Sequence, residues 1–243
     1  MKDPFSIRGI VFLAIFAILA FAGLQIGVFS IQGANGKAFT LFEFFGPMAG
    51  GFLGIGGAAV VFAAKLANAL INGTSLSLID VIKLTPMMFA AYYFWKNGAR
   101  GVSDKLAIVV PILAMAAFWM HPVGQGFVYI KELGTSIPAG IYALYWTIPI
   151  IAKMLPDRLF LRSLGATFTA HAVGCILWLY FPIIPYTPEA FIALIPVTAI
   201  ERTLFALGIS ASYIFFTNIL NAVDNALELS KHINVEKKYV LQL

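Results

Sequence analysis

Long apolar stretches separated by short polar connections run along almost the whole chain. Each stretch is about 18 residues or longer and carries few charges, which is enough to cross about 30 Å of hydrocarbon as a helix. The pattern predicts seven segments, at residues 7–30, 39–71, 77–95, 105–123, 137–155, 163–181 and 190–220.

These segments predict an all-α fold, a polytopic transmembrane bundle of six to seven helices with one helix broken or re-entrant. Residues 1–223 are expected to form a single transmembrane helical domain, and residues 224–243 a short cytoplasmic C-terminal tail that forms a surface helix. Prolines inside the segments mark expected kinks, because proline interrupts helical hydrogen bonding.

Composition agrees with a multi-pass protein of the cell membrane. The chain is 60% hydrophobic and 11% charged, with a mean hydropathy of +0.90. These values exclude soluble enzymes, nucleic-acid binders and disordered tails. The net charge of +5 is a matter of topology, because most Lys and Arg side chains lie in short connections between segments.

Basic residues predict the orientation of the second half. The connections 96–105 and 153–162 and the tail are each rich in Lys or Arg, so all three are expected in the cytoplasm. Residues 124–136 and 182–189 then face outside.

The membrane topology of the first half of the chain has two interpretations. The 39–71 segment would be about 50 Å long as one helix, too long for one crossing and short for two. Either this segment is broken or re-entrant, or the 96–105 connection lies outside.

Small residues recur at helical spacing in the 39–71 segment. One row is formed by Gly46, Gly50 and Gly54, and a second by Ala59, Ala63 and Ala67. Rows of this kind allow another helix to approach closely. They serve either packing within the chain or docking of a partner subunit.

Charged groups at membrane depth are costly and therefore informative. Lys65 and Asp80 are placed to pair across a hairpin, leaving Lys83 to reach towards the interface; the alternative is a site that attracts anions. His171 and Glu201 each lie 15 residues from a turn centred near residue 186, so neighbouring helices would hold them at one depth, where they could bond to each other or jointly bind a polar ligand. Arg202 points about 100° away from Glu201 and is expected to serve another partner or a different face.

Aromatic and polar side chains gather towards the outer ends of the later segments. Trp119, His121 and Trp146 belong to this group. An interfacial aromatic belt explains many such residues, and a pocket for a flat ligand is the alternative.

Signatures of catalysis are missing from the sequence. No HExxH, P-loop or GxSxG motif occurs, the histidines lack metal-ligand spacing, and Cys175 is the single cysteine. We therefore expect no enzyme, metal or cofactor, and any energy input must come from a gradient or a partner.

The chain resembles the substrate-binding S component of energy-coupling factor importers. The likeness rests on size, on the Phe45-Gly46-Pro47-Met48-Ala49-Gly50-Gly51 run, on the absence of large domains and on polar and aromatic residues in the later segments. It implies capture of a vitamin-like small molecule from outside, a lid formed by the outer loop after the first helix, and partner ATPases with a transmembrane coupling subunit.

The resemblance also implies site residues. It places Glu43 in the lid region and assigns the pocket to Trp119, His121, Trp146, His171 and Glu201. The family has six helices and carries its alanine pair in the first one, whereas here that spacing occurs in the second segment.

Two further hypotheses stand beside the importer subunit. One is a non-transporting membrane protein that packs against partner subunits through its Gly/Ala-rich face. The other is a membrane-embedded enzyme acting on lipid.

Overall fold

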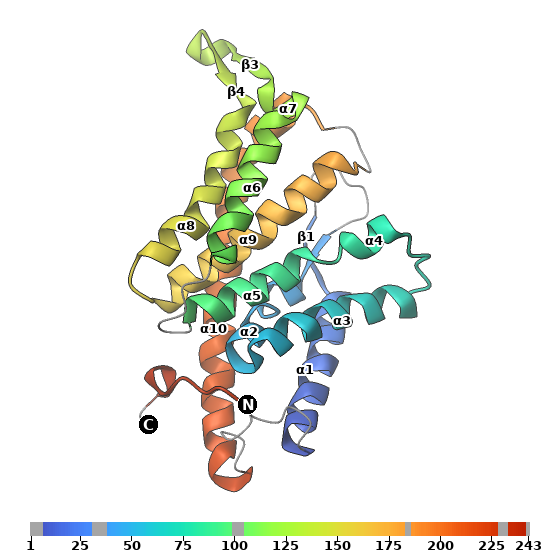
Figure 1. Ribbon diagram of the computed structural model, residues 1–243, viewed down its shortest axis with the longest axis vertical. Coiled ribbons are helices and arrows are strands. Elements are labelled where there is room, and N and C mark those ends of the chain that lie inside the picture. The colour runs from blue at the N-terminus through green and yellow to red at the C-terminus, as the bar shows by residue number, and fades with distance from the viewer. Residues whose placement is uncertain (1–6, 31–37, 99–104, 183–185, 228–232, 242–243) are drawn as a thin grey trace.

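The computed structural model describes residues 7–30, 38–98, 105–182, 186–227 and 233–241, and most of these residues are helical (Figure 1). The first half contains α1 (Ile7–Gln25), β1 (Gly27–Ser30), β2 (Ala38–Thr40), η1 (Leu41–Phe44), α2 (Met48–Leu53), α3 (Ile55–Ile71), α4 (Leu78–Ile82) and α5 (Pro86–Gly98). The second half contains α6 (Leu106–Met120), α7 (Pro122–Gln125), β3 (Phe127–Ile130), η2 (Lys131–Leu133), β4 (Thr135–Pro138), η3 (Ala139–Trp146), α8 (Thr147–Met154), α9 (Leu159–Tyr180), α10 (Pro188–Leu227) and η5 (Lys237–Tyr239).

A mostly helical fold was the expectation, and it is confirmed. The structure adds two antiparallel hairpins that the apolar pattern did not predict, β1–β2 and β3–β4. In the second hairpin Phe127 pairs with Pro138 and Ile130 with Thr135. This hairpin projects from one end of the molecule (Figure 1).

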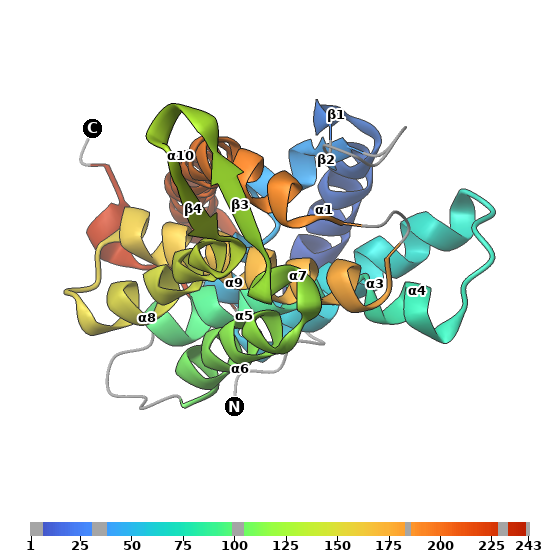
Figure 2. The same cartoon turned by 90° about the horizontal axis from the view of Figure 1, so that it is seen from above.

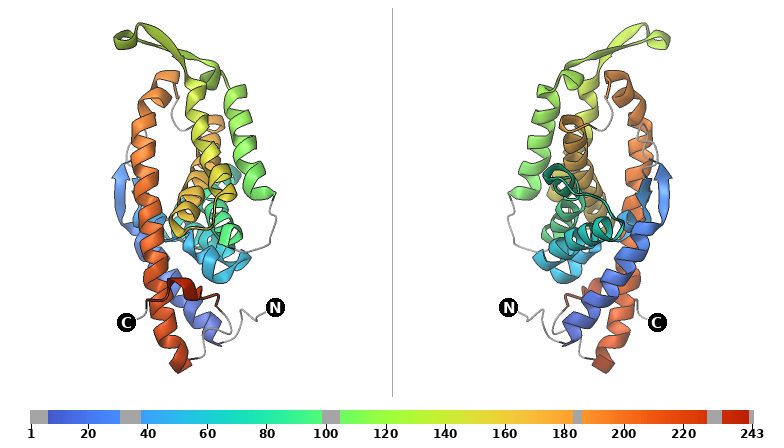
Figure 3. Two further views of the ribbon diagram at one scale, coloured as in Figure 1. Left: turned by 90° about the vertical axis from the view of Figure 1, so that its left-hand side faces the viewer. Right: turned by 90° about the vertical axis from the view of Figure 1, so that its right-hand side faces the viewer.

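Two of the described helices are long and apolar enough to cross a membrane. They are α9 and the Pro188–Ala222 part of α10. The 40 residues of α10 correspond to about 60 Å of helix. The helix runs along one side of the molecule, with α9 between it and α6 (Figure 3).

Three of the expected segments are divided into shorter elements. Within 39–71, Gly54 has a positive φ of 62° and separates α2 from α3, so the expected break is present. Within 77–95, α4 ends before Pro86, because a proline disfavours helical geometry in the residue that precedes it. The 137–155 segment begins in β4 and passes through the 3-10 helix η3 before α8.

The first-half helices lie across the others. α3 and α5 pack side by side and run across the long axis in Figure 1. Seen from above, α3 and α4 extend to one side of α9 and α8 to the other (Figure 2). This arrangement leaves a space between α3 and the α9–α10 pair in which a site can form.

Close backbone approach holds α5 at the centre of the fold. A Cβ atom on Gly50 would lie 1.8 Å from the Ala91 carbonyl oxygen, and one on Gly165 would lie 2.3 Å from the Tyr93 hydroxyl. The Tyr93 hydroxyl donates a hydrogen bond to the Pro149 carbonyl oxygen at 2.6 Å. Glycine is therefore required where α2 and α9 meet α5.

The residues of the first small-residue row serve this internal packing. Gly46 and Gly50 are buried against α5, and Gly54 lies near the Trp95 ring. In contrast, Ala59, Ala63 and Ala67 are all exposed on the outer face of α3. Of the two predicted rows, only the second is available to a partner.

The C-terminal segment docks on the body instead of forming the expected surface helix. The Asn234 amide donates to the Phe52 carbonyl oxygen at 3.0 Å, and Ile233 is buried. The fully buried Arg162 pairs with Asp157 at 2.8 Å and with Glu236. Residues 228–232 of the predicted tail lie outside the described residues.

The described parts of the basic segments lie close together. The Lys153 ammonium donates to the Lys96 carbonyl oxygen at 3.0 Å, and Lys238 pairs with Asp157 at 2.6 Å. The connection between α8 and α9 lies near mid-height in Figure 1, well below the β3–β4 hairpin.

Substituting Gly50 by alanine tests the close approach of α2 to α5. The added methyl group would overlap the Ala91 backbone, so we expect the free energy of unfolding in detergent to fall by about 1–3 kcal/mol or more. Gly56→Ala is the matched control, because its nearest neighbour would lie 4.0 Å away. The control should be neutral or stabilising by up to about 1 kcal/mol. Equal losses in the two variants would contradict this packing.

Acidification tests the Arg162 contacts. Burial opposes ionisation of Asp157 and Glu236, but hydrogen bonds and charge from Lys238 and Arg162 outweigh it, and the pKa of each carboxyl is lowered. A lowered pKa in the folded state stabilises the protein above the ordinary carboxyl range of about pH 4. This stabilisation is lost as the pH falls through the lowered pKa values.

The measurement is the hydrogen-exchange protection of the Asn234 amide between pH 7 and pH 3, corrected for the intrinsic rate. Protection should decrease at acid pH. Glu236→Gln should lose part of it already at pH 7, at a cost of about 1.5–3 kcal/mol. Protection that is independent of pH in both proteins would refute the assignment.

Candidate functional site

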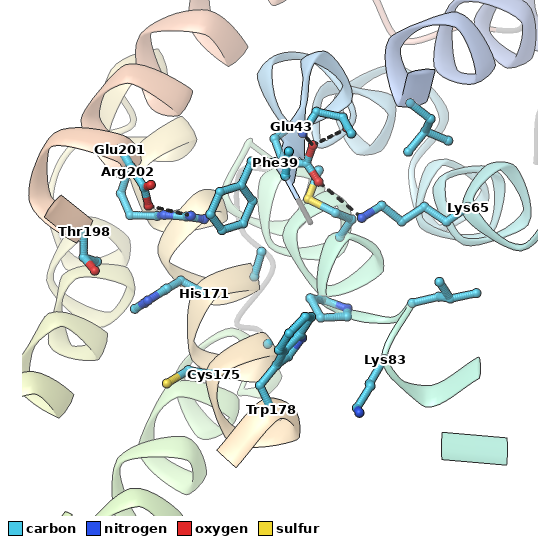
Figure 4. Close-up of a pocket in the computed structure, with 18 of the residues that line it drawn as sticks. Phe39, Glu43, Lys65, Lys83, His171, Cys175, Trp178, Thr198, Glu201 and Arg202 are labelled. Carbon is cyan, nitrogen blue, oxygen red and sulfur yellow. Dashed lines mark hydrogen bonds and ion pairs between the residues drawn. The ribbon is translucent and has the colours of Figure 1, made fainter. Parts of the chain in front are cut away.

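A cavity of about 520 Å³ lies between the first-half helices and the α9–α10 pair. Its walls come from β2, η1, α3, the start of α5, η3, α9 and α10. The ionisable side chains that line it are Glu43, Lys65, Lys83, His171, Cys175, Glu201 and Arg202. Figure 4 shows Glu201 and Arg202 on one side of the cavity and Glu43 and Lys65 on the other. In a chain with 11% charged residues, this concentration is the strongest chemical feature of the described structure.

One wall is organised by Glu43. Its Oε2 atom accepts from the Thr40 amide at 2.9 Å and from the Thr40 hydroxyl at 2.6 Å, which caps η1. Its Oε1 atom accepts from the Lys65 ammonium at 3.2 Å. The carboxylate therefore ties η1 to α3, and both of its oxygens are engaged.

The opposite wall carries Glu201 and Arg202. Their closest side-chain atoms, Oε2 and Nη2, are 3.5 Å apart. Arg202 is only 3% exposed, and its guanidinium carbon lies 4.6 Å from the Phe39 ring centre and 4.7 Å from that of Phe205. Its Nε and Nη2 atoms have no hydrogen-bond partner among the described residues.

His171 lies in a chain of hydrogen bonds beside this pair. The Trp146 indole N–H donates to Nδ1 at 3.1 Å, and Nε2 lies 2.9 Å from the Tyr142 hydroxyl. The Tyr142 hydroxyl in turn lies 2.8 Å from the Thr198 hydroxyl. An indole nitrogen can only donate, so Nδ1 accepts and the proton resides on Nε2. The contacts thus select the neutral Nε2–H tautomer.

The remaining end of the cavity is more apolar. Lys83 reaches over the Trp178 ring, with its ammonium 5.8 Å from the ring centre. Cys175 lines the same region (Figure 4). Among the described residues, no three His, Cys, Asp or Glu side chains gather as metal ligands.

Of the pocket residues predicted from sequence, Glu43, His171 and Glu201 line this one cavity. Trp146 lies behind the lining and acts on it through the hydrogen bond to His171. Trp119 and His121 do not line the cavity. Trp119 donates to the Gly140 carbonyl oxygen at 2.9 Å, and His121 accepts from the Val123 amide at 3.2 Å.

Some predicted contacts differ in the structure. His171 and Glu201 do share the cavity, but they do not bond to each other: His171 bonds to Trp146 and Tyr142, and Glu201 pairs with Arg202. Arg202 does not serve a separate face, because it pairs with Glu201 and faces the same cavity. Lys65 pairs with Glu43 instead of Asp80, whose carboxylate caps the start of α4 through Ser77.

The side chains that the sequence analysis left out of the pocket are chiefly Lys65, Tyr142 and Arg202. The signal for Arg202 was present, because a charge near the middle of an apolar segment requires a partner. Tyr142 belongs to the aromatic group at the outer ends of the segments, which an interfacial belt explains as well as a pocket does. The loop expected to act as a lid includes residues 31–37, which lie outside the described residues.

Comparisons with protein-family models, curated proteins and solved structures find no match. The function must therefore be argued from the cavity itself.

Trp146→Phe tests the tautomer of His171. In protein labelled with ¹⁵N-histidine, we expect the His171 signals of the unmodified chain to show the Nε2–H tautomer. Loss of the Trp146 donor should produce a mixture of both tautomers. His171→Gln identifies the signals by their disappearance.

Trp119→Phe is the matched control, because it also removes an indole donor but one that is bonded to Gly140. It should leave the His171 tautomer unchanged. A Nδ1–H tautomer in the unmodified protein would contradict the hydrogen-bond chain.

Proposed function

We propose that this chain is the solute-binding subunit of a micronutrient importer, a multi-pass protein of the cell membrane that depends on partner ATPase and coupling subunits. One observation carries the proposal. A cavity of about 520 Å³ gathers charged and aromatic side chains inside an otherwise apolar chain. Small-molecule sites are typically 300–1,000 Å³ with a few convergent polar groups on an apolar lining.

The location in a membrane is supported by several independent features. Two helices have the length and composition of membrane spans, and further apolar helices lie at Leu13–Gln25, Ile55–Ile71 and Leu106–Met120. Of these shorter helices, Ile55–Ile71 and the end of Leu13–Gln25 contribute to the wall of the cavity. The basic segments lie close together and are proposed to face the cytoplasm, so the pocket is proposed to receive its solute from the outer side.

Dependence on partners is supported by what the chain offers for energy coupling. The sequence has no P-loop, so ATP hydrolysis would take place on other subunits. The exposed row of Ala59, Ala63 and Ala67 presents a small-residue face on α3. Such a face allows close packing with a helix of a coupling subunit.

The same row favours a second candidate function. A non-transporting membrane protein would use Ala59, Ala63 and Ala67 to pack against partner subunits, and the cavity would then be structural. The two candidates differ in whether the cavity takes up a solute, which can be measured directly.

The test is a thermal-shift screen of the full chain in detergent against water-soluble vitamins. A vitamin present at 100 times its Kd should stabilise the protein by about 2.7 kcal/mol. Gly174→Phe fills part of the cavity and should abolish the shift. Gly174→Ala is the matched control, because its Cβ would lie 3.6 Å from Pro86, an ordinary contact.

The control should keep the full shift. If no vitamin raises the melting temperature, or if Gly174→Phe leaves a shift intact, solute binding in this cavity is refuted. The docking function would then be favoured.

A further inference from the structure

We infer that the solute is a small aromatic carboxylate, and that Arg202 is the residue that pairs with its carboxylate group. This inference rests on the proposed solute-binding function and adds the chemical class of the solute. It is argued from the charge balance of the cavity, the geometry of the guanidinium and the character of the lining.

The ionisable groups lining the cavity leave one positive charge without a counterpart. Lys65, Lys83 and Arg202 are cations, and Glu43 and Glu201 are the carboxylates that face them. The hydrogen bonds of His171 hold its imidazole in a neutral tautomer. A monoanionic ligand would bring the lining to neutrality, whereas a cation would add to the excess.

Among the three cations, Arg202 is the most deeply buried and has two donor atoms without a hydrogen bond to the described residues. Lys65 donates to Glu43 at 3.2 Å, and Lys83 reaches out over the Trp178 ring. Arg202 is almost completely buried, yet its Nε and Nη2 atoms have no hydrogen-bond partner among the described residues. A buried charge with unsatisfied donors is costly, so a partner that arrives with the ligand would relieve a cost already present in the empty site.

The positions of Nε and Nη2 of Arg202 indicate which ligand group would bind them. Nε–H and one Nη2–H point in parallel from the same edge of a guanidinium, and together they match the two oxygens of a carboxylate. Glu201 lies beside this edge, but at 3.5 Å it does not occupy it. The rings of Phe39 and Phe205 pack against the guanidinium group. The edge is therefore fixed in orientation before a ligand binds.

The rest of the lining favours a flat ligand body. Phe39, Tyr142, Trp178 and Phe191 contribute aromatic rings to the cavity. Aromatic groups stack on such rings in offset or edge-to-face arrangements. A phosphate dianion fits less well than a carboxylate, because it would bring two negative charges to a lining that lacks one.

The experiment measures binding of matched acids and amides to the full chain in detergent by isothermal titration. The probes are nicotinate with nicotinamide and indole-3-acetate with indole-3-acetamide, with phenyl phosphate as the phosphate probe. Each pair shares its ring and differs in charge. We expect at least one acid to bind more than tenfold more tightly than its amide, and phenyl phosphate to bind more weakly than that acid.

Variants assign the effect to Arg202. Arg202→Gln should weaken binding of the acid at least about 30-fold, and Arg202→Lys, which keeps the charge but loses the two-pronged edge, about tenfold. Glu201→Gln should strengthen binding, because it removes a competing carboxylate. Arg158→Gln is the control, because Arg158 is exposed and does not line the cavity.

Stability separates a binding role from a structural one. Removing a buried charge with unsatisfied donors should leave the melting temperature of the ligand-free Arg202→Gln protein unchanged or higher. If Arg202 instead held the fold together, this variant would melt at a lower temperature and Arg202→Lys would restore it. That result would overturn the inference.

Other results also overturn it. They are amides that bind as tightly as acids, tighter binding of phenyl phosphate, acid binding unaffected by Arg202→Gln, or no acid binding at 10 mM. If neutral vitamins still bind and Gly174→Phe blocks them, the anion assignment fails while the solute-binding function stands. If neither acids nor vitamins bind, both proposals fail.

Discussion

The fold depends on how an apolar chain accommodates two buried arginines. Arg162 is surrounded by the carboxylates of Asp157 and Glu236, and these contacts bring the C-terminal segment onto the body. Arg202 is equally buried but has one carboxylate, at 3.5 Å, and two unsatisfied nitrogens. Both charges carry the same desolvation cost, so the difference lies in what compensates it. Arg162, with two carboxylates, holds the C-terminal segment in place, whereas Arg202, with one carboxylate and two donors without hydrogen bonds, lines the cavity.

Close packing around α5 allows the cavity to exist. Gly50 lets α2 approach the α5 backbone, and Gly165 lets α9 approach Tyr93. These contacts place α3 against one side of α5 and α9 against the other. A Cβ atom at either glycine would push the helices apart and shift the walls that carry Lys65 and His171. The small residues therefore determine the position of the charged ones.

Much of the helical architecture could be predicted from the apolar pattern, because α6, α9 and α10 are long continuous apolar stretches. Pro111 and Pro196 lie inside two of these helices without ending them. The division of 39–71 into η1, α2 and α3 was foreseen only as a break of unknown position, since its location depends on the φ angle of Gly54. The β3–β4 hairpin was missed, because a strand of four residues leaves no clear period in an apolar background.

The residues of the candidate site could be predicted where their depth along the helices was enough to place them together. Glu201 and His171 follow from their equal distance to one turn, and both line the cavity. Lys65 was given the wrong partner, because Glu43 reaches it only through the η1 turn that the 39–71 pattern did not predict. Arg202 was assigned to another face from helix geometry, which describes the direction of the Cα–Cβ bond. A long side chain can return to its neighbour's side, and the 3.5 Å approach to Glu201 shows that it does.

The two sides of the cavity belong to different packing units. One hydrophobic cluster joins α2, α3 and α5 to the first part of α9, and a second joins α6, η3 and the later part of α9. Glu43 and Lys65 lie with the first cluster, whereas Tyr142 and Trp146 lie with the second. Helices α6, α9 and α10 each contribute residues to both clusters and so connect them, while the polar walls face each other across the cavity. A ligand that contacts both walls would therefore connect the two units through interactions that the empty protein lacks.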